Sequence, residues 1–298
     1  MESIVEIKNL TKKFGNVIAL DGINLEIKKG EIYGFIGPNG AGKTTTIRVL
    51  LGILKATKGE AKVFDMDAWK QAVEIHQRIA YVPGDVNLWD NLTGGEVIDL
   101  FIKLQGTNNK TRKEELIKKF DFDPTKKCGT YSKGNRQKVA LIAALASDAD
   151  FYILDEPTSG LDPLMENVFK ECIHELKKQK KTILLSSHIL KEVEELCDKI
   201  SIIRNGKIIE TGTLNELRHL TRMHVKVETK QKFNIANIKG VHGIIKNGNT
   251  TEFEVDNESL GEVISYLTKF EIIAFMCMPP SLEDLFMTHY KNEGDKSD

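Results

Sequence analysis

The sequence carries a glycine-rich stretch, GPNGAGKTT at residues 37–45, whose residue types suit phosphate binding. It fits G-x-x-x-x-G-K-[S/T] in full, between an apolar run and a helical pattern, which favours a phosphate loop over a mere glycine-rich turn. The glycines let backbone N–H groups close around a phosphate, Lys43 adds a positive charge, and Thr44 offers a hydroxyl to Mg²⁺. The predicted binding residues are Gly37, Pro38, Asn39, Gly40, Ala41, Gly42, Lys43, Thr44 and Thr45.

Two adjacent acids, Asp155 and Glu156, follow the apolar run FYIL at residues 151–154. Hydrolysis of a phosphate bond needs one carboxylate on the metal and another near the attacking water. Asp155 would hold Mg²⁺, directly or through water, and Glu156 would polarise the nucleophilic water. Solvated acids at an ordinary strand end are the alternative. Ligands of such sheets bind beyond the carboxyl ends of the strands, where the phosphate loop also lies, and this favours the metal and base roles.

A second helix start also suits an anion. In TYSKGNRQKVALIAALA, residues 130–146, a small polar turn opens an amphipathic helix. Backbone N–H groups at a helix N-terminus attract anions, so this turn is suited to a second phosphate contact. A plain helix cap is the alternative. The residues of the turn are Ser132, Lys133, Gly134 and Asn135.

Composition excludes several classes of protein. With 42 basic and 43 acidic residues the net charge is −1, so no overall field favours nucleic acid or an anionic membrane surface. No charged leader precedes an apolar stretch at the N-terminus, and no segment approaches the roughly 18 apolar residues of a spanning helix, so we expect a soluble protein. The four cysteines lack the spacing of a zinc or redox site and are interpreted as buried thiols in a reducing cytosol. They are Cys128, Cys172, Cys197 and Cys277.

The elements that must position these residues follow from the apolar patterns. Near-continuous apolar runs predict strands buried on both faces, and helical patterns between them predict a parallel sheet. These runs lie at residues 31–37, 151–155, 182–187 and 199–204. The first thirty residues alternate apolar with polar and predict an antiparallel sheet beside the parallel one. A helical subdomain is expected at about 92–147.

The pattern changes after residue 220. TEFEVD at residues 251–256 predicts a half-buried strand, and Ser259 stands three residues before Glu262, as in a capping box. A second capped helix is expected at Ser281, and the tail KNEGDKSD is expected to be disordered. The predicted fold is therefore α/β, with a first domain at 1–220 and a small α+β domain at 221–298.

The order of the motifs over residues 3–220 resembles the ATP-binding subunits of ABC transporters. In that resemblance GPNGAGKTT is similar to Walker A, YSKGNRQ to the signature, YILDEP to Walker B, SGLD to the D-loop, and SSH to the switch histidine. It implies a P-loop NTPase fold that binds ATP and Mg²⁺. It also implies that Phe14 stacks on adenine and that His188 contacts the γ-phosphate. The expected catalytic residues are Glu156, His188 and Lys43.

The resemblance also implies a homodimer of two chains packed head to tail. The signature residues of one chain, Ser132 to Asn135, would then cap the γ-phosphate held by the other, and Asp162 would contact the opposite subunit. Lys133 stands where the family has glycine, and Asn135 is one methylene shorter than the usual glutamine. Gly84 and Asp85 stand where a glutamine is expected after YVP. Asp85 is either a substitute metal ligand, since its carboxylate suits Mg²⁺, or a solvated loop residue.

A separate integral membrane permease is the implied partner, with the chain bound to the inner face of the cell membrane through it. GTLNELR and PSLEDLF, towards the end of the chain, resemble bacterial ATPases that serve drug or antibiotic export, so export of a drug, antibiotic, peptide or lipid-like cargo is expected over import. A soluble ABC ATPase of translation or DNA repair is the alternative. It would need tandem nucleotide domains or a long coiled-coil insert, and the sequence has neither, so no nucleic-acid partner is expected.

Overall fold

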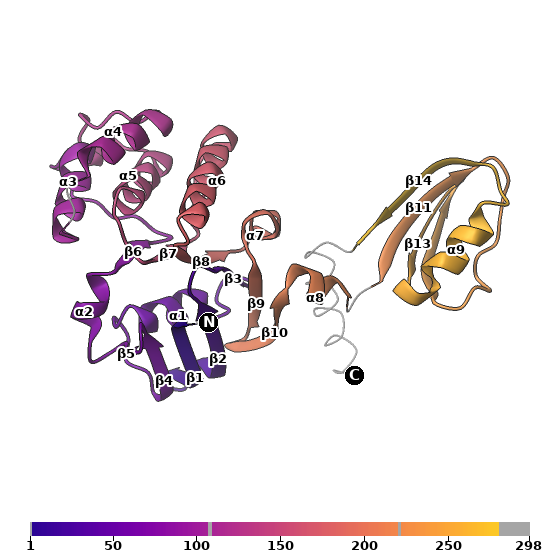
Figure 1. The fold of residues 1–298 in the computed structure, drawn as a ribbon, viewed down its shortest axis with the longest axis horizontal. Coiled ribbons are helices and arrows are strands. Elements are labelled where there is room, and N and C mark those ends of the chain that lie inside the picture. The colour runs from indigo at the N-terminus through magenta and orange to yellow at the C-terminus, as the bar shows by residue number, and fades with distance from the viewer. Residues whose placement is uncertain (1, 107–108, 220–221, 280–298) are drawn as a thin grey trace. The chain divides into compact units, whose positions relative to one another are not determined.

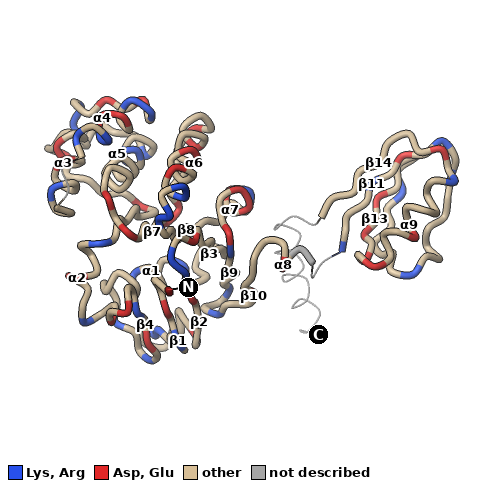
Figure 2. Tube along the Cα trace, in the orientation of Figure 1, with Lys and Arg blue, Asp and Glu red and all other residues tan. Residues whose placement is uncertain are grey.

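The computed structural model describes residues 2–106, 109–219 and 222–279 (Figure 1). By its internal contacts the chain divides into two compact units, Met1–Thr211 and Gly212–Asp298. Within the described residues no helix is long and apolar enough to cross a membrane. Lys and Arg alternate with Asp and Glu along both units (Figure 2), in keeping with the net charge of −1.

The first unit is built on a six-stranded sheet. Strand β3 is paired in parallel with β8 and β9, and β7 with β6 and β8, as the apolar runs predict. Every residue of β3, β7 and β8 is buried. The order across the sheet is β10 (Lys207–Thr213), β9 (Lys199–Arg204), β3 (Ile32–Ile36), β8 (Thr182–Ser187), β7 (Phe151–Asp155) and β6 (Ile79–Val82).

An antiparallel sheet accompanies it, as the alternating N-terminal pattern predicts. Its strands in order are β2 (Val17–Lys28), β1 (Ser3–Phe14), β4 (Lys58–Val63) and β5 (Met66–Asp67). Helix α1 (Lys43–Leu50) buries Ile47 and Leu50 in one apolar cluster with residues of both sheets, such as Ile7 and Phe35. This shared core fixes the start of α1 beyond the end of β3.

The remaining helices of this unit flank the large sheet or form a separate group. Figure 1 shows α3, α4 and α5 gathered together, in the part of the chain where a helical subdomain is expected. Helix α3 begins with a capping box in which Thr93 and Glu96 satisfy each other's backbone N–H groups. The helices are α2 (Ala72–His76), α3 (Gly94–Leu104), α4 (Lys110–Lys119), α5 (Lys133–Leu145), α6 (Pro163–Lys178) and α7 (Leu190–Leu196), with a 3₁₀ turn, η1, at Cys128–Thr130.

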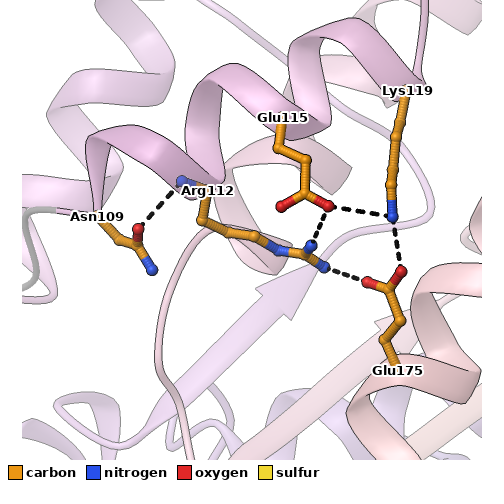
Figure 3. A network of polar contacts seen from close by, with 5 residues as sticks. All are labelled: Asn109, Arg112, Glu115, Lys119 and Glu175. Atoms are coloured by element: carbon orange, nitrogen blue, oxygen red, sulfur yellow. Dashed lines mark hydrogen bonds and ion pairs between the residues drawn. The ribbon is translucent and has the colours of Figure 1, made fainter.

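Ion pairs join α4 of the helical group to α6 (Figure 3). The Arg112 guanidinium lies 2.7 Å from Glu175 Oε2, and Lys119 Nζ lies 2.6 Å from Glu175 Oε1. Glu115 accepts from both cations on the α4 side, at 2.9 and 3.2 Å. Partly exposed single pairs contribute little, but a network that shares its partners holds two helices in one geometry.

The second unit is a small α+β domain, as predicted. Its antiparallel sheet packs on helix α9 (Leu260–Leu267), and Val227, Phe253, Val263 and Leu267 are among the core residues. The outermost strand β14 has no charged residue, and six of its seven residues are exposed. The elements are α8 (Leu214–His219), β11 (Met223–Thr229), β12 (Val241–Asn247), β13 (Thr250–Val255), η2 (Asn257–Ser259), α9 and β14 (Ile272–Met278), with sheet order β12-β13-β11-β14.

The capping box expected at Ser259 is wrong. Ser259 closes the 3₁₀ turn η2, so its backbone is already helical and its side chain makes no cap hydrogen bond. An N-cap needs an extended backbone to turn its oxygen toward the helix. The helix expected at Ser281 and the tail lie outside the described residues. The predicted domain boundary follows residue 220, whereas the contacts group α8 with the second unit.

Candidate functional site

The glycine-rich stretch forms the link between β3 and α1. Gly40 and Gly42 have φ of 80° and 117°, which favour glycine, and a Cβ added to Gly37 would lie 2.2 Å from the Ile203 carbonyl oxygen. The loop therefore depends on glycine for both conformation and space. Helix α1 begins at Lys43, and the first N–H groups of a helix lack intrahelical partners. This is the geometry of a phosphate loop.

Lys43 is buried at the start of α1. Its Nζ donates to the carbonyl oxygens of Gly37 at 2.6 Å and Pro38 at 3.2 Å, and lies 3.8 Å from Glu156 Oε1. Burial lowers the pKa of Lys43, while the charges of Glu156 and Asp155 oppose that shift. Phosphate oxygens would give this ammonium charged acceptors in place of neutral carbonyls, and such hydrogen bonds are about twice as strong.

Asp155 ends β7 beside the first turn of α1. Its Oδ2 accepts a hydrogen bond from Thr44 Oγ1 at 2.9 Å. Its Oδ1 is buried and accepts no well-formed hydrogen bond from the described residues, and burial raises the pKa of this carboxyl while the Ser186 and Thr44 hydroxyls oppose that shift. An orphaned buried carboxylate oxygen beside a hydroxyl fits a hard divalent cation. The two oxygen donors therefore fit Mg²⁺, which takes few protein ligands and completes its shell with water and phosphate.

Glu156 brings the expected catalytic groups together. Its Oε1 lies 3.2 Å from His188 Nδ1, and Lys43 approaches the same oxygen. Glu156 has φ of 49°, unusual for a residue with a side chain, and its N–H donates to the Ser186 carbonyl oxygen at 2.8 Å. Such strained backbone gathers at functional sites. Lys43 and His188, from two other segments of the chain, thus converge on the Glu156 carboxylate.

The turn that carries His188 is supported by contacts that the sequence does not predict. Ser187 Oγ donates to the buried Glu192 Oε2 at 2.8 Å and accepts from the Ile189 N–H at 3.0 Å, which fixes the turn that carries His188. Glu192 Oε1 is buried and accepts no well-formed hydrogen bond from the described residues, and burial raises the pKa of this carboxyl while the Ser187 and Thr158 hydroxyls oppose that shift. A glutamate inside the charged run LKEVEEL gives no sign of burial, so the sequence held no usable signal.

The second anion-suited turn opens α5. Ser132 is the N-cap, and its Oγ accepts from the Asn135 N–H at 3.3 Å. Lys133 Nζ donates to Ser159 Oγ at 2.7 Å, and Ser132 and Lys133 are exposed. The buried Gln137, also missed by the sequence analysis, donates to the Pro157 carbonyl oxygen at 2.9 Å. The start of α5 is therefore tied to the segment that follows Glu156.

The structure describes three further predicted site residues, Asp162, Phe14 and Asp85. Their roles remain predictions. Asp162 caps α6, accepting from the N–H groups of the second and third helical residues at 3.0 Å. Phe14 ends β1 and is 47% exposed, and the Lys12 ammonium lies 4.8 Å from the ring centroid. Asp85 is exposed in the bend after β6. A Cβ added to the neighbouring Gly84 would lie 3.3 Å from the Asp155 carbonyl oxygen, so this bend runs past the end of β7.

Comparison with known families supports the resemblance in both units. The family described as ABC transporter matches residues 20–159. The family described as ATP-binding protein DrrA1-3-like, C-terminal domain matches residues 212–290. The second match covers a part of the chain whose role the motifs do not address.

Curated relatives and solved structures agree. The chain is 42% identical over 67% of its length to the ABC transporter ATP-binding protein NatA of Bacillus subtilis, covering 84% of that protein. It is 32% identical over 96% of its length to the bacitracin transport ATP-binding protein BcrA of Bacillus licheniformis, covering 97% of it. A solved ATP-binding subunit of an ABC transporter is similar over 73% of this chain and 92% of its own, with 30% identity and a TM-score of 0.68. A dimeric ATP-binding cassette bound to ADP and Pi is similar over 70% of this chain and 98% of its own, with 26% identity and a TM-score of 0.64.

Proposed function

The chain belongs to the ATP-binding subunits of ABC transporters, and from that premise we propose that it hydrolyses ATP, with Mg²⁺, to power a separate membrane permease. The convergence of Lys43 and His188 on the Glu156 carboxylate, beside Asp155, carries this proposal. A phosphate loop alone accounts for nucleotide binding. A buried acid, a base and a histidine gathered at the same end of the sheet account for hydrolysis.

In the proposed mechanism the loop N–H groups and Lys43 bind the β- and γ-phosphates. Glu156 accepts the proton of the attacking water, and His188, within hydrogen-bond distance of that carboxylate, holds it and contacts the γ-phosphate. Thr44 and Asp155 are the proposed Mg²⁺ ligands. When bound, the metal would neutralise charge on the phosphate oxygens. Phe14, exposed at the end of β1, would stack on the adenine.

We further propose that two copies of the chain share each nucleotide. The exposed start of α5 and the dimeric form of the related ADP-bound cassette support this arrangement. Ser132, Lys133, Gly134 and Asn135 of one copy would then face the γ-phosphate held by the other, and Asp162 would lie at the contact.

Mixing two inactive variants tests the shared site. A dimer of a Ser132→Arg chain with a Lys43→Ala chain has one site with both defects and one with neither. An equal mixture is therefore expected to regain about a quarter of wild-type ATPase activity, since half of the dimers are mixed and each keeps one site. Each variant alone stays inactive. A mixture no more active than its components would reject sharing.

The proposed permease contact lies on the helical subdomain. An apolar pocket there is lined mainly by residues after β6 and on α3 and α5, including Val86, Leu88, Phe101 and Ala143. At its edge Trp89 and Phe101 are exposed with ring centroids 6.4 Å apart, and Leu104 is 71% exposed. Aromatic side chains in such a patch are typical anchors of protein interfaces. We propose that a cytoplasmic segment of the permease docks here, which would keep the chain at the inner face of the cell membrane.

Capture from detergent extract tests the permease partner. The tagged chain is expected to retain a polytopic membrane protein, and Trp89→Ala with Phe101→Ala is expected to lose it while keeping ATP binding. Val73→Ala, which removes another exposed apolar side chain, is the matched control. Retention of ribosomes or DNA ends instead would favour the alternative, a soluble ABC ATPase of translation or repair.

Export is the proposed direction of transport. The bacitracin transporter subunit is similar over almost the whole chain, and the second unit matches the DrrA-like C-terminal family. We propose a drug, antibiotic, peptide or lipid-like cargo. Cells that produce the chain with its permease are expected to tolerate more of the cargo compound than cells with the Glu156→Gln chain. Equal susceptibility across a panel of such compounds would count against export.

A further inference from the structure

Lys133 makes a contact that the proposed function leaves unused. Its ammonium donates to Ser159 Oγ at 2.7 Å, which joins the first residue of α5 to the segment between Glu156 and Asp162. In the part of the chain that the structure describes, no carboxylate forms an ion pair with Lys133. A neutral hydroxyl is thus the polar partner of an exposed cation at the mouth of the proposed shared site.

The backbone around this contact is built to let it form. Gly160 has φ of 82°, and a Cβ there would lie 3.2 Å from Lys133 Cγ, so the lysine stem runs along a bare glycine. A Cβ on Gly134 would lie 2.5 Å from the Gly160 carbonyl oxygen. The buried hydrogen bond from Gln137 to Pro157 anchors the same segment one helical turn further on. The hydrogen bond from Lys133 to Ser159 is therefore the exposed part of the contact between α5 and the segment after Glu156. It can break while the buried part of that contact stays in place.

We propose that Lys133 exchanges the Ser159 hydroxyl of its own chain for the γ-phosphate of the nucleotide held by the second copy. The exchange rests on the shared site proposed above. Before closure the lysine holds the segment after Glu156 against α5. A phosphate offers the ammonium charged oxygens, which it binds more strongly than a hydroxyl. Closure of the dimer thereby releases the segment that carries Glu156 at one end and Asp162 at the other.

The two partners of this contact are expected to respond in opposite directions when removed. Ser159→Ala removes only the bond to be broken, so the ATP concentration for half-maximal dimer formation should fall by about threefold. Lys133→Met keeps the stem but removes the charge-assisted bond to phosphate, so that concentration should rise by about tenfold. The double variant should match Lys133→Met, because Ser159 then has no ammonium to hold. A merely structural contact predicts shifts of the same sign for both single variants.

The measurement uses the full-length chain in a Glu156→Gln background, where hydrolysis does not reopen the dimer, with sedimentation at rising Mg²⁺ and ATP. Binding of ATP to the monomer should be unchanged in all variants. Lys133→Met should also weaken the dependence of dimer formation on salt, because one phosphate contact is lost. Lys138→Met is the matched control, since Lys138 lies on the same helix and points to the Asp121 carbonyl oxygen.

The outcomes distinguish a failure of the exchange at Lys133 from a failure of the shared nucleotide site. If the Glu156→Gln chain stays monomeric with saturating Mg²⁺ and ATP, the shared site itself fails, and the exchange fails with it. If that chain dimerises but Ser159→Ala and Lys133→Met shift the ATP dependence in the same direction, or not at all, the exchange alone is overturned. Opposite shifts with a non-additive double variant support it.

Discussion

The phosphate loop and the start of α5 both offer an anion a helix N-terminus, yet they differ in how complete they are. Around the loop, Lys43 is buried and lies within 3.8 Å of Glu156, which in turn lies 3.2 Å from His188. At α5, Lys133 is exposed and contacts only the hydroxyl of Ser159 among the polar partners described. The first site draws its expected lysine, base and histidine from one chain. Among the described residues the second has a cation with no ion-paired carboxylate, an arrangement that suits a site completed by another copy.

The largest expected effect lies at the complete site. Glu156→Gln should lower ATP turnover by about 10²–10⁴-fold, the usual range for a lost general base, while ATP binding persists. Phosphate release and nucleotide binding measured on the same preparation separate the two steps. Unchanged turnover would place the base elsewhere and would remove the contrast between the two sites.

A smaller loss of ATP turnover is expected when the start of α5 is displaced. Gly134→Ala places a methyl group 2.5 Å from the Gly160 carbonyl oxygen, so the segment after Glu156 must shift. A misplacement near 1 Å costs about 10²-fold in rate, and we expect a loss of that order in turnover. Gly261 is the matched control, because it is likewise the second residue of a helix, α9, and has open space around it. Gly261→Ala should leave turnover unchanged; a full loss there, or none in Gly134→Ala, would contradict the account.

A variant at Asp85, in the bend after β6, tests whether the site around the phosphate loop extends to this residue. If Asp85 contacts Mg²⁺ or its water, Asp85→Ala should lower turnover by about tenfold, the range for a lost outer ligand, and raise the Mg²⁺ requirement. Asp90→Ala, at another exposed acid of the same loop, is the control. Turnover and permease coupling that do not change at any Mg²⁺ concentration would make Asp85 a solvated loop residue.

The smallest effect is expected at Glu192, which holds the turn that carries His188. Because burial raises the folded-state pKa of Glu192 above its ordinary 4.5, the folded chain binds more protons than the unfolded chain between these two values. Stability from this group therefore falls as pH rises through that window. Nearby Glu166 acts in the same direction and Lys170 opposes it. Glu192→Gln keeps an acceptor for Ser187 and removes the free-energy cost of burying an ionised carboxylate.

The Glu192→Gln chain should accordingly have a higher Tm than wild type at pH 8, with the difference shrinking toward pH 5. Thermal unfolding at both pH values measures it. Glu171→Gln, at an exposed position, is the control and should show no such trend. A Tm that falls equally at both pH values would mean that the charged form of Glu192 stabilises the turn.

The sequence predicted the parts of the molecule that depend on local pattern. Apolar runs predicted β3, β7, β8 and β9, because a strand buried on both faces needs apolar residues throughout. The glycine spacing predicted the phosphate loop, because only glycine adopts its backbone.

Contacts that join distant segments were not predictable in the same way. The burial of Glu192 and of Gln137 depends on neighbours brought in by the fold, and neither local sequence differs from that of an exposed helix face. The bond from Lys133 to Ser159 spans 26 residues. Ser259 has the right residue type for a cap, but it is the last residue of a 3₁₀ turn and so has the wrong backbone conformation.

The outer strand of the second unit, with six of its seven residues exposed, has a practical consequence. Strand β14, IIAFMCM, combines seven residues without charge, proline or glycine, and such an edge templates the addition of identical strands. The second unit produced by itself is therefore expected to form fibrils at high concentration, visible by thioflavin fluorescence. A single Ala274→Lys gatekeeper should suppress them.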